Sequence, residues 1–152
     1  MTTILSPTRG GEPSYQNQDK VIAIAKERDA KLIFLYVSDV QFDHELTEDT
    51  LTNVSAELED LGQFLLSMAQ ERAALEGIQA DALVKSGNFR EVLESAIQDN
   101  QVDMLILGSP EQESAVTTSV FLKDLSTNLA HKYSLEVILL RAGDVLETFS
   151  PS

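Results

Sequence analysis

The stretch Asp103-Met104-Leu105-Ile106-Leu107-Gly108-Ser109-Pro110 places a short apolar run directly before a loop that contains glycine and proline. A second stretch near the start, Thr3-Ile4-Leu5-Ser6-Pro7-Thr8-Arg9-Gly10-Gly11, follows the same pattern. Short apolar runs of this kind are typical of buried parallel strands that end in loops. Loops at the carboxyl ends of parallel strands meet at one edge of a sheet and form the ligand crevice. We therefore expect the function of the chain to reside in these two loops.

Segments with strand and helix patterns alternate along the whole chain. We expect strands over residues 3–6, 31–37, 80–85, 104–107 and 137–141, separated by helices over 15–29, 50–76, 89–100 and 119–132. This alternation predicts an α/β, Rossmann-like fold with one doubly wound, five-stranded parallel sheet, in the order 3-2-1-4-5, and helices on both faces. We expect one domain over residues 1–142 and a frayed C-terminal tail over 143–152.

The predicted helix over residues 50–76 is longer than the strands beside it require. A helix of about 25 residues spans roughly 37 Å, so we expect its start to overhang the sheet and to cover either the ligand crevice or a partner. Its apolar residues recur at spacings of three and four, a pattern that favours a core-facing stripe over a coiled-coil seam.

The composition excludes several classes of protein. The 152 residues include 25 acidic and 11 basic side chains, for a net charge of −14, which argues against binding to nucleic acid or anionic lipid. The chain has no cysteine, so disulfides and thiolate metal sites are excluded. Its apolar runs are too short to cross a bilayer, and no basic segment with a following apolar run opens the sequence. We expect a cytoplasmic protein.

Several segments, taken in order, resemble the universal stress protein (UspA-like) family. The residues that carry the resemblance are Ile4-Leu5-Ser6-Pro7-Thr8, Ala23-Ile24-Ala25-Lys26, Ala30-Lys31-Leu32-Ile33-Phe34-Leu35-Tyr36-Val37, Lys85-Ser86-Gly87-Asn88-Phe89, Asp103-Met104-Leu105-Ile106-Leu107-Gly108-Ser109 and Val137-Ile138-Leu139-Leu140-Arg141. The resemblance covers nearly the whole chain.

One motif of the family is broken in this chain. ATP-binding members share a glycine-rich stretch after the fourth strand. It consists of Gly, two residues, Gly, about nine residues, and then Gly followed by Ser or Thr. Glycine is needed there because it lets backbone N–H groups approach phosphate. Gly108 fills the first position and Glu111 the second. Counting forward from Gly108 places Phe121 at the last position, and aligning backward from the last predicted strand places Lys123-Asp124 there. Neither alignment finds a glycine. Arg9 stands where the family has an early acidic residue, so the resemblance implies a subclass without an intact ATP motif.

The charges near this motif also disfavour a triphosphate. Glu111, Glu113 and Asp124 would repel it, and each unfavourable pair costs about 1 kcal/mol at 4 Å in water. These repulsions offset the attraction of Arg9 and Lys123, so we predict weak or no ATP binding and expect no cofactor. A different anionic ligand, held by Arg9, Lys123 and the start of the last helix, is an open alternative.

Three functional hypotheses follow from the resemblance and the broken motif. The first is a non-catalytic, stress-response regulatory binding module. The second is an adenine-nucleotide (ATP or AMP) sensor, and the third a weak nucleotide hydrolase, which would need a metal-binding acid near the phosphates. The candidate crevice consists of Pro7, Thr8, Arg9, Val37, Gly87, Gly108, Ser109 and Lys123. We assign no catalytic residue and no metal site, and we interpret Asp43-His44-Glu45 as a solvated loop.

The predicted last strand supplies the candidate partner surface. The resemblance implies a homodimer in which Val137, Ile138, Leu139, Leu140 and Arg141 pair antiparallel with their copies. The physical reason is that an apolar strand at the end of a sheet would otherwise be an exposed edge. An unidentified protein partner is expected as well.

Overall fold

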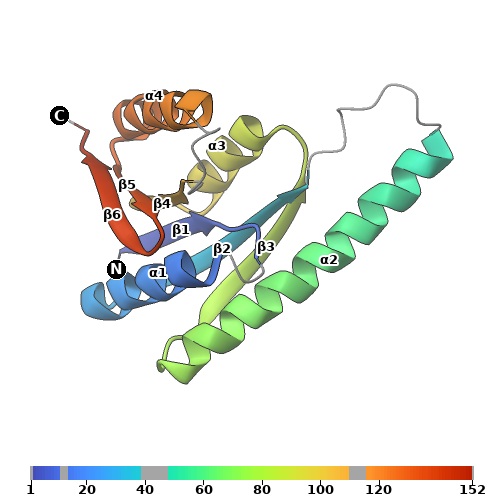
Figure 1. The fold of residues 1–152 in the computed structure, drawn as a ribbon, viewed down its shortest axis with the longest axis horizontal. Helices are drawn as coiled ribbons and strands as arrows, with labels where there is room; N and C mark the ends of the chain where they lie inside the picture. The colour runs from blue at the N-terminus through green and yellow to red at the C-terminus, as the bar shows by residue number, and fades with distance from the viewer. Residues whose placement is uncertain (1, 11–13, 39–47, 110–115, 152) are drawn as a thin grey trace.

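The structure, a computed structural model, describes residues 2–10, 14–38, 48–109 and 116–151 (Figure 1). Strands and helices alternate as the sequence predicts, and one further strand follows at the C-terminus. The elements are β1 (Thr3–Pro7), α1 (Tyr15–Arg28), β2 (Lys31–Ser38), α2 (Glu48–Leu75), β3 (Ala80–Ser86), α3 (Phe89–Asp99), β4 (Met104–Gly108), α4 (Val116–Tyr133), β5 (Glu136–Arg141) and β6 (Asp144–Phe149).

The strands form one sheet in the order β3-β2-β1-β4-β5-β6. The first five strands of this order pair in parallel, and β6 pairs antiparallel with β5. The predicted doubly wound α/β fold and the order 3-2-1-4-5 are confirmed. The predicted number of five strands is wrong by one, because β6 extends the sheet beyond β5.

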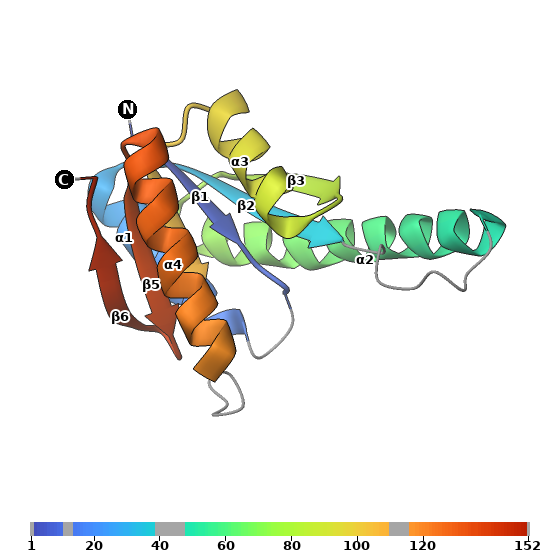
Figure 2. The same ribbon diagram turned by 90° about the horizontal axis from the view of Figure 1, so that it is seen from above.

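Two layers of helices enclose the sheet, with α1 and α2 on one face and α3 and α4 on the other (Figures 1 and 2). Successive side chains of each central strand point to opposite faces. In β1, Ile4 packs in the core beneath α1 and α2, whereas Leu5 packs in the core beneath α3 and α4. Both side chains are fully buried, which explains why the inner strands are continuous apolar runs.

The segment after residue 142 is ordered as a strand, so the expectation of a frayed tail is wrong. Ala142 and Gly143 form a two-residue hairpin turn with φ values of +52° and +84°, which is typical of a type I′ turn. Left-handed φ at a residue with a Cβ costs about 1–2 kcal/mol, and alanine is not a usual turn signal. The strand itself is exposed except for Phe149, which packs against the core beneath α3 and α4.

Because of this hairpin, β5 is not the edge strand of the sheet. Residues Val137–Arg141 were expected to form the free edge of the sheet, but β6 occupies that edge and pairs with Arg141, Leu140 and Leu139. The premise of the predicted dimer contact is therefore wrong, and the dimer itself stays a prediction.

Three helix-to-strand turns share an unusual backbone feature. Asp29 after α1, Gln101 after α3 and Ser134 after α4 have φ values between +51° and +53°. Helices commonly use glycine at such a left-handed end, and α2 does so at Gly77, with φ of +81°. The turns at the amino-terminal edge of the sheet are thus short and, in three of these four cases, built without glycine.

Helix α2 overhangs the sheet as the sequence predicts, extending past the carboxyl ends of β2 and β3 (Figures 1 and 2). Its sheet-facing side includes Gly62, which is buried. A Cβ at Gly62 would lie 2.5 Å from the Cδ1 atom of Tyr36 in β2. Glycine in mid-helix thus allows α2 to approach the Tyr36 ring, while Leu61 and Phe64 on other sides of the helix remain exposed.

The contact at Gly62 gives a test of this packing. We expect Gly62→Ala to lower the free energy of unfolding by about 1–3 kcal/mol because the methyl group overpacks the site, although alanine is the better helix former by about 1 kcal/mol. Urea unfolding followed by circular dichroism measures the change. Glu71→Ala, at an exposed position of the same helix, is the matched control and should change stability by less than about 0.5 kcal/mol. An unchanged or higher stability of Gly62→Ala would contradict the close packing.

Candidate functional site

Six of the eight predicted crevice residues lie at or next to the carboxyl ends of four neighbouring strands. Pro7 and Gly108 end β1 and β4, and Thr8 and Ser109 follow them directly. The other two, Val37 and Gly87, lie beside the ends of β2 and β3. The structure therefore brings these six residues to one edge of the sheet, where the order of strands reverses around β1 and β4.

The loop after β1 is closed by its own hydrogen bonds. The Thr8 hydroxyl accepts from the backbone N–H of Gly10 at 3.1 Å and from the Gln18 side chain of α1 at 3.0 Å. Gly10 has φ of +72°, and a Cβ there would lie 2.6 Å from the Cβ of Leu65 in α2. Glycine is thus required both by the backbone conformation and by the approach of α2. Arg9 lies on this loop and is exposed.

The ends of β2 and β3 are joined by a second polar group. The backbone N–H of Gly87 donates to the Ser38 carbonyl at 2.9 Å, and the Ser38 and Ser86 hydroxyls lie 2.9 Å apart. Ser86 also donates to a carboxylate oxygen of Glu59 in α2 at 3.2 Å. A carboxylate therefore lies beside these two strand ends, and Glu59 is not among the residues that the sequence predicts for the site.

Asn17 of α1 fills the space beside Gly108. A Cβ at Gly108 would lie 2.9 Å from the Asn17 amide nitrogen, and the amide oxygen of Asn17 accepts from the backbone N–H of Gly143 at 2.8 Å. One side chain thus links the end of β4 with the β5–β6 turn. Asn17, Gln18 and Glu59 all come from helices, and only the rotation of each helix against the sheet brings them to the edge.

Arg141 is a further residue at this edge, at the end of β5. Its Nη2 atom lies 3.5 Å from the hydroxyl of Ser109, which is buried and whose backbone N–H donates to the Leu140 carbonyl at 2.6 Å. The Nε atom of Arg141 is buried and has no hydrogen-bond partner among the described residues. The sequence predicts Arg141 only as part of the dimer contact, and its position beside Ser109 was not predicted.

Lys123 lies apart from the other crevice residues. Its ammonium group is 3.6 Å from a carboxylate oxygen of Glu147 in β6, and Glu147 pairs with Leu139, within β5 rather than at its end. The interpretation of Lys123 as a residue of the crevice therefore has no support from its position. Glu111 and Glu113 fall outside the described residues.

The match to a family model covers residues 1–141 and carries the description "Universal stress protein family". The chain belongs to the universal stress protein family. The residues matched include every crevice position and the whole of β5, and they end just before the β5–β6 turn. A comparison with curated proteins finds no match.

Solved structures of this family have the same fold. The universal stress protein UspA from Lactobacillus plantarum is 20% identical, with 92% of this chain and 97% of that chain covered and a TM-score of 0.72. A universal stress protein in complex with cAMP is 20% identical, with coverage of 91% and 96% and a TM-score of 0.64. A family protein from Arabidopsis thaliana with AMP bound is 13% identical, with coverage of 93% and 92% and a TM-score of 0.60. At these identities the similarity concerns the fold.

The described residues of this universal stress protein show neither a metal-ligand cluster nor a helix suited to crossing a membrane. The ranges 2–10, 14–38, 48–109 and 116–151 contain no group of three or more potential metal ligands. The segment Asp43-His44-Glu45 lies outside these ranges. In the same part of the chain, no helix combines the length and the apolar composition that crossing a bilayer requires.

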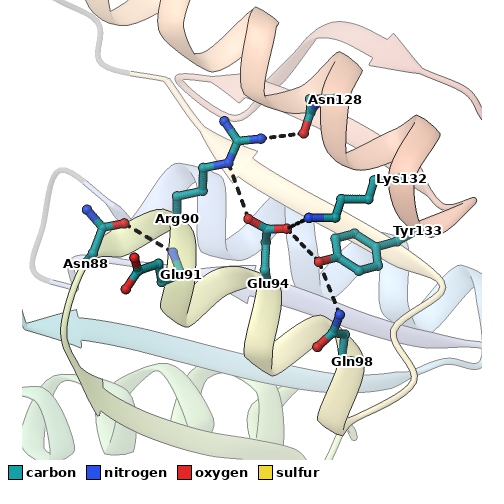
Figure 3. Close-up of polar contacts among 8 residues, drawn as sticks. All are labelled: Asn88, Arg90, Glu91, Glu94, Gln98, Asn128, Lys132 and Tyr133. Atoms are coloured by element: carbon teal, nitrogen blue, oxygen red, sulfur yellow. Dashed lines mark hydrogen bonds and ion pairs between the residues drawn. The ribbon is translucent and has the colours of Figure 1, made fainter.

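A second polar cluster links α3 with α4, on the face of the sheet opposite α1 and α2 (Figure 3). The Glu94 carboxylate accepts from the Lys132 ammonium at 2.7 Å, from the Tyr133 hydroxyl at 2.6 Å and from Arg90 Nε at 3.3 Å. Arg90 also donates to Asn128, and Gln98 donates to the Tyr133 hydroxyl at 3.3 Å. These donors come from both helices, so the cluster fastens one helix to the other.

The pKa values in this cluster follow from its hydrogen bonds. Donation from Lys132, and then from Tyr133, lowers the pKa of Glu94 to about 2 from its usual 4.5. The hydrogen bond to Glu94 raises the pKa of Lys132, and burial, followed by the hydrogen bond to Glu94, raises that of Tyr133. All three groups keep their usual charge at neutral pH. This arrangement favours a structural role over proton transfer, which needs a pKa near the working pH.

The cluster predicts how stability depends on pH. Glu94→Gln should lower the free energy of unfolding by about 2 kcal/mol at pH 7 because charged acceptor bonds are lost. Since the pKa of Glu94 is lower in the folded state, its contribution is complete above about pH 5 and disappears as the pH falls towards about 2. Urea unfolding at pH 7 and pH 3 measures both effects. Glu91→Gln, an exposed acid of the same helix, is the control, and a Glu94→Gln deficit that does not shrink in acid would rule out this explanation.

Proposed function

We propose that this universal stress protein is a non-catalytic stress-response regulatory module that binds ATP weakly or not at all. The observation that carries the proposal is the use of backbone donors at the crevice. The N–H groups of Gly10, Gly87 and Ser109 donate to Thr8, Ser38 and Leu140 within the protein itself. A phosphate-binding loop instead directs such N–H groups at the ligand. These three N–H groups are therefore not available to a phosphate.

The charges at this edge support the same proposal. The Glu59 carboxylate lies at the ends of β2 and β3 through its hydrogen bond with Ser86. Lys123, the cation expected to offset such repulsion, is paired with Glu147. Because unit charges interact by about 1 kcal/mol at 4 Å even in bulk water, an uncompensated carboxylate at a crevice weakens the binding of an anion.

The proposed absence of catalysis rests on the needs of phosphoryl transfer. Nucleotide hydrolysis requires a metal ion to neutralise the phosphates and a residue to position the attacking water. Arg9 stands at the position where the resemblance to ATP-binding family members implies an acidic residue. An arginine at that position would repel the metal ion rather than bind it.

Titration calorimetry with MgATP tests the proposal. We expect no binding tighter than about 100 µM for the unchanged chain, because the crevice donors are engaged and the glycine motif is broken. Glu111→Gly restores the second glycine and should increase the affinity for MgATP. Glu113→Gly removes a neighbouring acid without restoring the motif and is the matched control. Micromolar binding by the unchanged chain would refute the proposal.

A second candidate function is the recognition of an adenine nucleotide with a single phosphate. The observation that favours it is Arg141, whose guanidinium is half-buried beside Ser109 and has an Nε atom without a partner among the described residues. A guanidinium is suited to phosphate oxygens, and one such group can hold one phosphate without a glycine loop. Two of the similar structures contain cAMP and AMP.

This candidate predicts an order of affinities. AMP and cAMP should bind more tightly than ATP, and Arg141→Met should weaken AMP binding at least about tenfold by removing a charge-assisted contact of about 1.5–3 kcal/mol. Calorimetry with AMP measures both. Lys31→Met removes an exposed cation at the opposite end of the sheet and should leave AMP binding nearly unchanged. Equal losses in the two variants would indicate a general charge effect and would exclude a specific phosphate contact at Arg141.

A further inference from the structure

Helix α2 carries a regular apolar repeat along most of its length. Between residues 51 and 75, the positions spaced alternately by three and four residues hold apolar side chains with one exception, Arg72. This spacing corresponds to the a and d positions of successive heptads, by which two helices pair in a coiled coil. We call these positions the α2 seam: Leu51, Val54, Leu58, Leu61, Leu65, Met68, Arg72 and Leu75.

The core-facing side of α2 consists of other residues. Leu66, Ala69 and Ala73 are fully buried and belong to the core beneath α1 and α2. By contrast, Leu61 and Leu75 of the seam are 45% and 83% exposed. Three more seam residues are partly buried and belong to neither apolar core of the described chain: Leu58, Leu65 and Met68. The expectation of a core-facing stripe is therefore wrong for the seam, which lies on a second side of the helix.

Helix α1 lies beside the end of the seam. The Arg72 guanidinium bonds to Asp19 and lies 4.3 Å from the centre of the Tyr15 ring. Tyr15 is the first residue of α1, so the part of α2 before Arg72 extends past the start of that helix (Figures 1 and 2). On this extension the Phe64 side chain is 61% exposed. One apolar side is ordinary for a helix, whereas a second apolar side that the fold leaves exposed indicates an interaction surface.

The residues that flank the seam determine which kind of helix can pair with it. On one flank, at the heptad e positions, Gly62 and Ala69 are buried against the protein itself. On the other flank, at the g positions, Glu57, Phe64 and Glu71 are exposed. Neither glutamate has an ion pair within the described ranges. Charges at these flanking positions select the partner of a coiled-coil helix, so the open flank favours a helix that carries lysine or arginine.

A second copy of this chain does not meet that requirement. In an antiparallel pair of α2 helices, the open flanks would face each other and bring glutamates together. In a parallel pair, the open flank of one helix would meet the other flank of its copy, where Gly62 and Ala69 are already buried. The net charge of −14 adds repulsion to both arrangements. Charge complementarity therefore favours a different, basic partner.

We propose that the α2 seam docks a helix of another protein, one with an apolar heptad repeat flanked by lysine or arginine. The apolar residues of that helix pack against Leu61, Phe64 and Met68, and its cations pair with Glu57 and Glu71. The inference rests on the proposed regulatory role, for which it supplies the kind of partner. It does not require the crevice to bind a nucleotide, so calorimetry with MgATP and the docking experiment can fail separately.

Fluorescence anisotropy with a labelled synthetic peptide tests the docking. The probe has three heptads, with leucine at a and d and lysine at e and g. One control peptide has glutamate in place of lysine, and another has the composition of the probe in scrambled order. We expect the probe to bind the unchanged chain at least about tenfold more tightly than either control, because apolar and charged contacts both contribute. No binding at about 100 µM of the chain would overturn the proposal.

Exposed apolar residues provide a matched pair of variants. Leu61→Ala/Phe64→Ala should weaken binding of the probe at least about tenfold, and circular dichroism should show an unchanged fold because both side chains are exposed. Val120→Ala/Phe121→Ala removes two exposed apolar side chains from α4 and should change the affinity less than about twofold. Equal losses in the two variants would contradict docking at the seam.

The charges are tested in the same way. Glu57→Gln/Glu71→Gln should weaken binding of the probe more than Glu91→Gln/Asp99→Asn, which removes the same charge from exposed positions of α3. Equal binding of the probe and the scrambled peptide would show attraction by net charge alone and would overturn the proposal. A dimer of the unchanged chain that dissociates in Leu61→Ala/Phe64→Ala, seen by light scattering, would show that a second copy occupies the seam instead.

Discussion

The structure depends on the burial of the central strands β1 and β4 on both faces of the sheet. Ile4, Leu5 and Leu105 are fully buried, and each lies in one of two separate apolar cores. A strand that is covered from both sides leaves little room for polar side chains along its length, and Ser6 is the buried polar residue of β1. Polar groups must therefore collect where the strands end, and the helix layers have to enclose both faces. The shared location of the predicted crevice residues follows from this single constraint.

Much of the fold was predictable because the apolar composition of the inner strands indicates that they are buried on both faces of the sheet. The run Leu32–Val37 is apolar without alternation, and the alternation of strands and helices limits the order of a parallel sheet. Strand β6 has no such signal, since its side chains are mostly exposed and its turn begins with alanine. Its stability comes from pairing with β5, which is a tertiary interaction.

The positions of the crevice residues were predictable for a similar reason, whereas their partners were not. Pro7 and Gly108 lie at the same edge because parallel strands end together. That Asn17 fills the space beside Gly108, or that Lys123 pairs with Glu147, depends on how far each helix is rotated and on the presence of β6. In this universal stress protein, several backbone N–H groups at this edge donate to acceptors within the protein.

The residues with left-handed backbone conformation, Asp29, Gln101 and Ser134, limit how the sequence of this chain can evolve. Each joins a helix to the next strand through only a few residues at one edge of the sheet, and such turns do not accommodate changes in length. The opposite edge has longer connections, such as those between β2 and α2 and between β4 and α4. Insertions, deletions and grafted segments should therefore be tolerated at one end of the molecule and rejected at the other, so new specificities can evolve without disturbing the framework.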